Sequence, residues 1–151
     1  KDVFIPKIRH RGGYVEQDKY LNMKIKKKYH FYAGHRNKEA GEKCGRLHGH
    51  TYDVEVMLEF TKMENGLTML FSDIDLICEP IIKYYDHYFI FKDDDPMVEL
   101  FEIANEPYRA VPFETSAENM AIWIFNQIKQ KLPIIEITLA ETKTSKIVYN
   151  G

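Results

Sequence analysis

Three histidines and one cysteine have the types and spacing that a metal site requires. His48 and His50 are separated by one glycine, so in a strand both imidazoles project from the same face, about 7 Å apart along the backbone. One divalent ion can bind both rings, and His35, at the end of the preceding hydrophobic stretch, can supply a third. Three neutral imidazoles with an open fourth position are the ligand set of a catalytic zinc ion. The thiol of Cys44, four residues before His48, can reach such a site along the chain.

Two simpler interpretations compete with a metal site. A histidine pair separated by one residue also occurs in surface loops with scattered histidines. Core histidines that ordinary hydrogen bonds satisfy are the other alternative. The elements that carry the three histidines bear on this choice.

Two long stretches with a period of two residues would position these histidines. In residues 21–35 and 48–60 most apolar side chains and all three histidines share one parity, which predicts two half-buried strands with core-facing histidines. Lys27 is the one interruption in the first stretch. The opposite parity carries lysines in the first stretch and acids in the second, namely Lys24, Lys26, Lys28, Asp53, Glu55 and Glu59. These charges are complementary if the two strands pair antiparallel.

The middle of the chain contains shorter patterns. A turn at 64–66 and a short strand at 69–71 precede a predicted helix from about 72 to 85, with Ser72 and Asp75 as its capping box. Pro80 would kink or divide that helix. Asp86 and His87 then lead into the apolar run 88–91, which suggests a histidine held near the interior. A short helix is expected over 96–105 and a brief strand over 109–113.

The C-terminal third predicts a helix followed by a hairpin. Ser116 can cap a helix over 116–132 with Glu118 in its first turn, and Pro133 ends it. The hairpin spans 134–142 and 146–149, and Glu141 continues the apolar parity of Ile135, Ile137 and Leu139. Glu141 is equally a strand-end residue that reaches solvent or a buried acid. A buried acid here would suit a ligand with two adjacent N–H groups, such as a guanine-like or pterin edge.

Composition limits the classes of protein that fit. The 151 residues suit one domain, with residues 1–20 as an extension and 21–151 as the body. A net charge of −2 gives no argument for nucleic acid or an anionic membrane as partner. No apolar run reaches the length of a membrane span. Two cysteines do not make a disulfide framework, so a reduced, cytoplasmic setting is expected.

Five motifs resemble, in order, those of the 6-pyruvoyltetrahydropterin synthase / 6-carboxytetrahydropterin synthase family. They are Phe31-Tyr32-Ala33-Gly34-His35, Cys44-Gly45-Arg46-Leu47-His48-Gly49-His50, Asp86-His87, Ser116-Ala117-Glu118-Asn119 and Glu141-Thr142. The resemblance covers about residues 21–150. It implies an α+β tunnelling fold, in which a four-stranded antiparallel sheet with two helices on one face has the order ββααββ. It also implies a homo-oligomer, in which three sheets close into a barrel and two trimers stack as a hexamer.

The resemblance further implies a zinc-dependent lyase that acts on 7,8-dihydroneopterin triphosphate. The implied roles are zinc ligation for His35, His48 and His50, general base for Cys44, acid/base for His87 oriented by Asp86, pterin anchoring for Glu141, and further substrate contacts for Glu118, Ser116 and Arg36. The chain departs from the usual family pattern at Leu70, Phe91 and Thr115, and none of these is an implied ligand or catalytic group.

The four-residue step from Cys44 to His48 resembles the carboxy branch of the family. That branch forms 6-carboxy-5,6,7,8-tetrahydropterin, acetaldehyde and triphosphate for 7-deazaguanine and queuosine biosynthesis. Two alternatives stay open. One is a 6-pyruvoyltetrahydropterin synthase, which eliminates triphosphate in the biopterin pathway. The other is a non-catalytic zinc- or pterin-binding paralogue.

Overall fold

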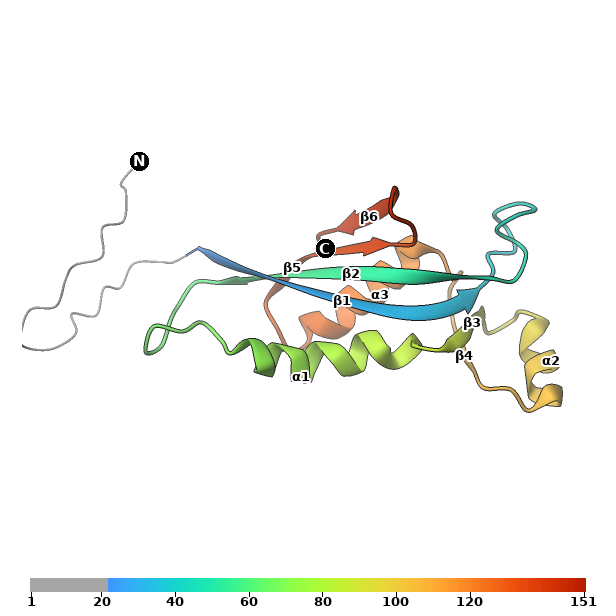
Figure 1. Cartoon of the computed structure of the whole chain (residues 1–151), viewed down its shortest axis with the longest axis horizontal. Coiled ribbons are helices and arrows are strands. Elements are labelled where there is room, and N and C mark those ends of the chain that lie inside the picture. Colours follow the sequence, from blue (N-terminus) through green and yellow to red (C-terminus); the bar gives the residue numbers. More distant parts are fainter. Residues whose placement is uncertain (1–21) are drawn as a thin grey trace, which may run out of the picture.

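A computed structural model describes residues 22–151, and the expected extension over 1–20 lies outside the described residues. The chain is α+β, with helices packed along a long, twisted sheet (Figure 1). In order they are β1 (Met23–His35), β2 (His48–Phe60), α1 (Phe71–Ile82), the 3₁₀ turn η1 (Lys83–Tyr85), β3 (Tyr88–Lys92), α2 (Met97–Ala104), β4 (Tyr108–Val111), α3 (Ala117–Lys129), β5 (Ile134–Ala140) and β6 (Lys146–Tyr149).

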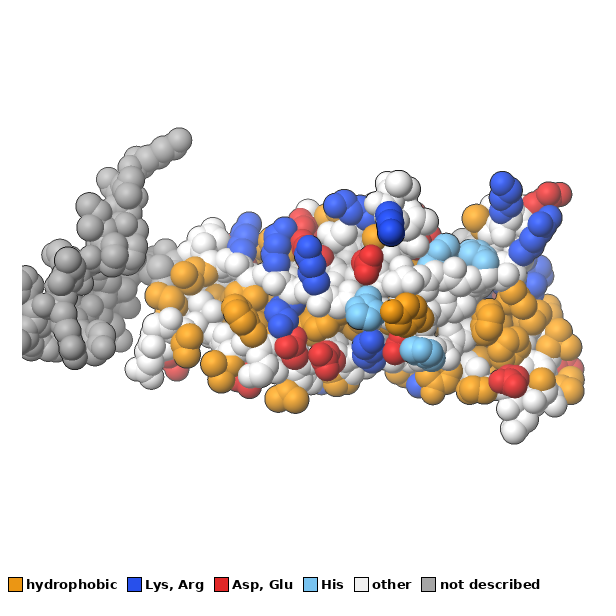
Figure 2. All heavy atoms as spheres, viewed as in Figure 1, with side chains coloured by type: hydrophobic (Ala, Val, Ile, Leu, Met, Phe, Trp, Pro, Cys, Tyr) orange, Lys and Arg blue, Asp and Glu red, His pale blue; other side chains and the backbone are white. Residues whose placement is uncertain are grey.

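β1 and β2 are the two longest strands and pair antiparallel at the centre of the sheet. The period of two residues in the sequence predicted both strands. The register places His35 opposite His48 at one end and Met23 opposite Phe60 at the other. On the outer face, Lys26 Nζ lies 2.9 Å from Glu55 Oε1, and Lys24 and Lys28 approach the acids of β2 more distantly. Basic and acidic side chains stand side by side on this face (Figure 2). The predicted charge complementarity of the two strands is confirmed.

The sheet has six strands in the order β4-β3-β1-β2-β5-β6, so the expectation of four antiparallel strands was wrong. The antiparallel set β1, β2, β5 and β6 is present. β3 adds to β1 in parallel, and β4 adds to β3 in parallel. Both added strands are short, and a parallel pair joins segments that are distant in sequence, so no hairpin signal marks them. The strand expected at 69–71 is absent, because α1 begins at Phe71.

Helices α1 and α3 cover one face of the sheet, as expected. Their buried side chains share a single core with the inward side of β1, β2 and β5, in which Phe31 stacks on Tyr52 with ring centroids 4.7 Å apart. α1 continues through Pro80 and tightens into η1 afterwards. The third helix, α2, lies beside β3 and β4 and packs through Phe101 against Phe89 and Phe91.

Local signals at element ends were partly correct. Ser116 Oγ accepts the amide of Asn119 and caps α3, as predicted. Ser72 makes no such cap for α1, whose N-cap residue Leu70 provides no side-chain hydrogen bond. A register shift at Met57/Leu58 makes Ile134, rather than Ile135, the buried residue at the start of β5. Over the described part of the chain, no helix combines the length and apolarity that crossing a membrane requires.

Candidate metal and substrate site

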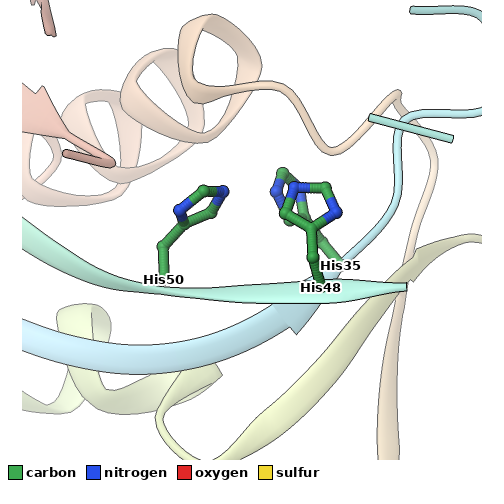
Figure 3. A group of neighbouring side chains, drawn as sticks. All are labelled: His35, His48 and His50. Atoms are coloured by element: carbon green, nitrogen blue, oxygen red, sulfur yellow. The ribbon is translucent and has the colours of Figure 1, made fainter. Parts of the chain in front are cut away.

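Three imidazoles converge where β1 ends and β2 begins. His35, His48 and His50 each offer a ring nitrogen, and these atoms lie within 4.8 Å of one another. The rings point away from the sheet toward the segment that leads into α3 (Figure 3). His35 is almost fully buried, while His48 and His50 are partly exposed. All three project from the core-facing side, as their shared parity predicted.

Backbone carbonyls fix the tautomers of two of these rings. His35 Nδ1 donates to the carbonyl of Thr115 at 2.7 Å, and His48 Nδ1 donates to that of Arg46 at 2.7 Å. Because a carbonyl only accepts, both Nδ1 atoms carry the proton and both Nε2 atoms keep a free lone pair. Burial lowers the pKa of His35 to about 4, against the opposing effect of the Thr115 hydrogen bond. His35 is therefore neutral at pH 7, which is the state that binds metal.

The Nε2 atom of His35 is buried and has no hydrogen-bond partner among the described residues. Leaving a buried imidazole nitrogen unpaired is costly unless something from outside the chain satisfies it. Three neutral imidazoles suit zinc, and a metal ion would occupy this lone pair. The donor set therefore fits a divalent metal, and it contradicts the surface-loop interpretation of the histidine pair.

Glu141 lies beside the histidine cluster, one residue after β5 ends. Its Oε1 atom accepts the Tyr52 hydroxyl at 3.4 Å and lies 3.8 Å from His35 Nε2. The side chain is 29% exposed, and among the described residues no lysine or arginine pairs with it. Glu141 thus lies between the two expectations of a solvent-reaching residue and a buried acid. It is half-buried, and its carboxylate can still accept hydrogen bonds beside the histidine cluster.

Cys44 lies in the loop that joins β1 to β2. Its carbonyl accepts the amide of Asn37 at 2.8 Å, which folds the loop back toward the end of β1. The thiol is exposed and is not part of the group that could hold a metal. Within one chain the structure therefore brings the three histidines and Glu141 together, and it leaves Cys44 exposed on the loop, outside that group.

Asp86 and His87 lie on the other side of the sheet. The Tyr32 amide donates to Asp86 Oδ1 at 2.9 Å, and the His87 amide donates to the Tyr32 carbonyl at 2.6 Å. Asp86 Oδ2 lies 3.1 Å from His87 Nδ1, so the carboxylate orients the ring. The side chain of His87 is 74% exposed, which corrects the expectation of a histidine near the interior. The run 88–91 forms β3 instead, and His87 precedes it with a positive φ of 65°.

A hollow of about 420 Å³ adjoins His87 on this outer face. Tyr32 and Phe89 line it, together with the backbone of Gly34 and Gly49, which face each other in the register. A Cβ at Gly34 would lie 2.3 Å from the Phe89 ring, so only glycine allows that ring to pack here. Burial raises the pKa of Asp86, and the hydrogen bonds from Tyr32 and His87 with the Lys83 charge outweigh it, so the net shift is downward.

Two of the three remaining candidate residues have structural partners. Ser116 caps α3, whereas Glu118 is exposed in the first turn of that helix. Arg36 forms a two-point ion pair with Asp95, a partner that no local pattern indicated. Sequence reasoning also missed Tyr52 and Thr115 as neighbours of the site. Tyr52 follows His50 on the same parity, which was the available signal, whereas Thr115 is 80 residues from His35 and had none.

Comparison with known sequences agrees with this geometry. Residues 24–151 match the family described as 6-pyruvoyl tetrahydropterin synthase. The chain belongs to that family. A family member from Haemophilus influenzae, named 6-carboxy-5,6,7,8-tetrahydropterin synthase, is 34% identical over 137 residues, which cover 83% of this chain and 97% of that protein. The Aquifex aeolicus protein of the same name is 28% identical over 85% of this chain and 98% of its own length.

Solved structures with the family's fold cover the same part of the chain. An uncharacterized protein from Wolinella succinogenes superposes with a TM-score of 0.74 at 21% identity, covering 87% of this chain and 99% of that one. The Caenorhabditis elegans 6-pyruvoyl tetrahydropterin synthase gives a TM-score of 0.66 at 23% identity, covering 87% and 97%. At these identities the two structures establish the fold alone.

Proposed function

We propose that this protein is a zinc-dependent 6-carboxy-5,6,7,8-tetrahydropterin synthase, which converts 7,8-dihydroneopterin triphosphate to 6-carboxytetrahydropterin, acetaldehyde and triphosphate. The observation that carries the proposal is the buried Nε2 of His35, which has no hydrogen-bond partner within residues 22–151 and lies among three convergent imidazoles with a carboxylate 3.8 Å away. The names of the relatives and the short step from Cys44 to His48 support the carboxy product. Elimination of triphosphate to the 6-pyruvoyl product is the second candidate, because the Caenorhabditis elegans protein of the same fold bears that name.

His35, His48 and His50 would hold the zinc ion through ring nitrogens. When bound, zinc supplies Lewis acidity toward the hydroxyls of the substrate side chain. Glu141 would bind the pterin ring, since an ionised carboxylate accepts two adjacent N–H groups at once. Its half-burial strengthens these hydrogen bonds by excluding water.

Cys44 and His87 would move the protons of the reaction. A cysteine thiolate is a competent base, and the exposed loop that carries Cys44 begins directly after His35. The Asp86 carboxylate holds Nδ1 of His87, so the opposite ring nitrogen is left to exchange a proton with substrate. This pair would act as the second acid/base.

A complete site on this plan requires a second copy of the chain. The metal cluster lies on the core-facing side of β1 and β2, whereas the His87 ring packs edge-on to Tyr32 on the outer side, with centroids 5.5 Å apart. Within residues 22–151, β4 and β6 are the edge strands of the sheet, and unpaired strand edges also favour association. We therefore infer a tunnelling-fold assembly of trimers or hexamers, in which His87 of one subunit serves the metal cluster of another.

The test is the identity of the products. Zinc-loaded protein is incubated with 7,8-dihydroneopterin triphosphate, and the products are identified by mass spectrometry. Release of 6-carboxytetrahydropterin with acetaldehyde supports the proposal, and triphosphate release without acetaldehyde favours the pyruvoyl synthase. Cys44→Ala should keep its zinc and lose turnover by about 10²–10⁴. A Cys44→Ala protein that loses its zinc would instead make the thiol a metal ligand.

The shared site can be tested by mixing two inactive variants. Cys44→Ala and His87→Ala are each expected to be nearly inactive alone. If subunits share sites, unfolding and refolding the two together creates mixed sites with both wild-type residues, and activity returns. Absence of any recovery, or a monodisperse monomer by light scattering, would rule out the shared site.

A further inference from the structure

The metal ligand His35 belongs to a hydrogen-bonded clamp that reaches beyond the histidine cluster. β1 ends at His35, so the next residue, Arg36, has no place in the sheet ladder. Thr115 joins both residues, because its carbonyl accepts His35 Nδ1 at 2.7 Å and its hydroxyl donates to the Arg36 carbonyl at 3.0 Å. Thr115 is completely buried. Thr115 thus fixes the ring of His35 through its carbonyl and the backbone of Arg36 through its hydroxyl.

The guanidinium of Arg36 continues the clamp to the turn before α2. Arg36 Nε donates to Asp95 Oδ2 at 2.8 Å, and Nη2 donates to Oδ1 at 2.5 Å. Asp95 is only 8% exposed, and its Oδ1 also accepts the amide of Met97 at the start of α2. Such a two-point pair fixes orientation as well as distance. It joins the strand end that carries His35 to the segment between β3 and α2.

The same pair argues against a role for Arg36 as an anion ligand. Asp95 occupies two donors of the guanidinium and neutralises its charge in a site where the Arg36 side chain is 19% exposed. A triphosphate would have to displace a nearly buried carboxylate to use those donors. Arg36 is better suited to hold the backbone than to bind substrate.

We propose that Arg36 is a positioning residue for His35, and that Asp95 and Thr115 hold it in place. Through these contacts the β3–α2 segment sets the metal affinity of the histidine cluster. The proposal rests on the proposed function in one respect, which is that the cluster binds zinc. Loss of a hydrogen-bonding partner behind a ligating histidine lowers metal affinity by about 10–100-fold, and a comparable loss is expected when the clamp is opened.

Asp95→Asn opens the clamp with little change of shape. Asparagine can still accept the Met97 amide and begin α2, but it cannot provide a charged two-point partner for Arg36. Thr115→Val removes the hydroxyl that holds the Arg36 carbonyl, and Thr115→Ser retains it. Asp75→Asn is the matched control. Asp75 lies on α1 and accepts hydrogen bonds from Lys27 and Tyr29, which belong to the same strand β1 but are remote from the metal cluster.

The measurements are zinc affinity by competition with a chromophoric chelator, and the visible absorption spectrum of the cobalt-substituted protein. We expect Asp95→Asn and Thr115→Val to bind zinc about 10–100-fold more weakly and to alter the cobalt spectrum. Thr115→Ser and Asp75→Asn should match the wild type in both. Wild-type affinity and spectrum in Asp95→Asn would overturn the proposal. So would an equal loss in Asp75→Asn, since the effect would then be one of general stability.

Two further outcomes separate this inference from others. If wild-type protein binds neither zinc nor cobalt, the metal-dependent function fails, and the clamp fails with it. Inorganic tripolyphosphate serves as a probe for the alternative role of Arg36. Asp95→Asn would bind it more tightly than wild type if the freed guanidinium were an anion ligand, and that result with unchanged zinc affinity would overturn the clamp.

Discussion

Two polar clusters lie on the core-facing side of β1 and β2, and they differ in how far their hydrogen-bonding capacity is used. In the Asp75 cluster, Asp75 accepts Lys27 Nζ at 2.9 Å and the Tyr29 hydroxyl at 2.8 Å. In the Glu141 cluster, Glu141 accepts the Tyr52 hydroxyl at 3.4 Å and lies near Nε2 of His35, which has no hydrogen-bond partner in the part of the chain that the structure describes. Each pairs a strand tyrosine with a carboxylate from a distant element.

The difference indicates which cluster stabilises the fold and which binds a ligand. The Asp75 cluster is complete, because a cation and a hydroxyl balance the carboxylate and join α1 to β1. The Glu141 cluster keeps acceptors free on a carboxylate and on an imidazole, without a cation from the described residues. Polar groups left unsatisfied in a folded chain destabilise it, so a ligand from outside is the expected partner. Substitutions that act on one cluster only can test this division.

Replacing Glu141 should have the largest effect, and the effect should be on binding. Glu141→Gln puts an amide donor opposite the N–H donors of a pterin, which we expect to weaken binding by about 1–3 kcal/mol. The free energy of unfolding should be unchanged, because Glu141 makes no ion pair with a lysine or arginine in the described residues. Fluorescence titration with neopterin, which has the ring but no triphosphate, checks the affinity. Unchanged affinity would remove Glu141 from the binding site.

Replacing Asp75 should have the opposite pattern. Asp75→Asn leaves the Lys27 ammonium, whose side chain is 21% exposed, without its counter-ion. The cost lies between that of an exposed pair and that of a buried one, about 1–2 kcal/mol in the free energy of unfolding. Urea denaturation at neutral pH measures it. Zinc and neopterin affinities should equal those of the wild type, and a loss of either would mean that the two clusters are not independent.

The contrast between the clusters also explains what the sequence could and could not predict. Alternation identified β1, β2 and the core-facing histidines, because the period of a strand is a local property. Lys27 interrupted that pattern without an evident reason, since its partner Asp75 is 48 residues away on α1. The same Asp75 suggested a capping box with Ser72, whereas its carboxylate is bound by Lys27 and Tyr29. Partners made by tertiary contacts leave no trace in spacing.

Contacts between distant segments also explain the errors at the site. β3 and β4 are strands of five and four residues that pair in parallel, so their addition to β1 depends on segments far apart in the chain. The expected position of His87 followed from the apolar run after it, but that run is a strand and His87 lies on the outer face. Thr115 and Asp95 contact His35 and Arg36 across 80 and 59 residues.

A smaller effect should distinguish the two tyrosines. Tyr29→Phe removes a 2.8 Å hydrogen bond to Asp75, and we expect a loss of about 0.5–1.5 kcal/mol in the free energy of unfolding. Tyr52→Phe removes a 3.4 Å contact and should cost less stability, while it changes neopterin affinity because Glu141 loses a partner. Urea denaturation and fluorescence titration of both variants provide the comparison. If Tyr29→Phe and Tyr52→Phe lose the same free energy of unfolding and bind neopterin with the same affinity, the two clusters have the same role.

The smallest effect concerns the acid side of the stability profile. The hydrogen bond from Lys27 lowers the pKa of Asp75 below its ordinary 3.8, and Tyr29 and the Lys27 charge add to this against the effect of burial. A carboxylate whose pKa is lower in the folded state adds stability above the unfolded pKa, and that stability is lost as pH falls through the folded pKa. The difference between wild type and Asp75→Asn should therefore be largest at about pH 7 and shrink toward about pH 3.

Urea denaturation of the two proteins across this range measures the difference directly. Asp73→Asn controls for the change in net charge, because Asp73 is exposed two positions earlier on α1 and makes no ion pair within residues 22–151. Its difference from wild type should stay small throughout. If the Asp75→Asn difference is constant from neutral to acidic pH, the ion pair with Lys27 does not stabilise the folded state. The Asp75 cluster would then not be the one that stabilises the fold, and its contrast with the Glu141 cluster would fail.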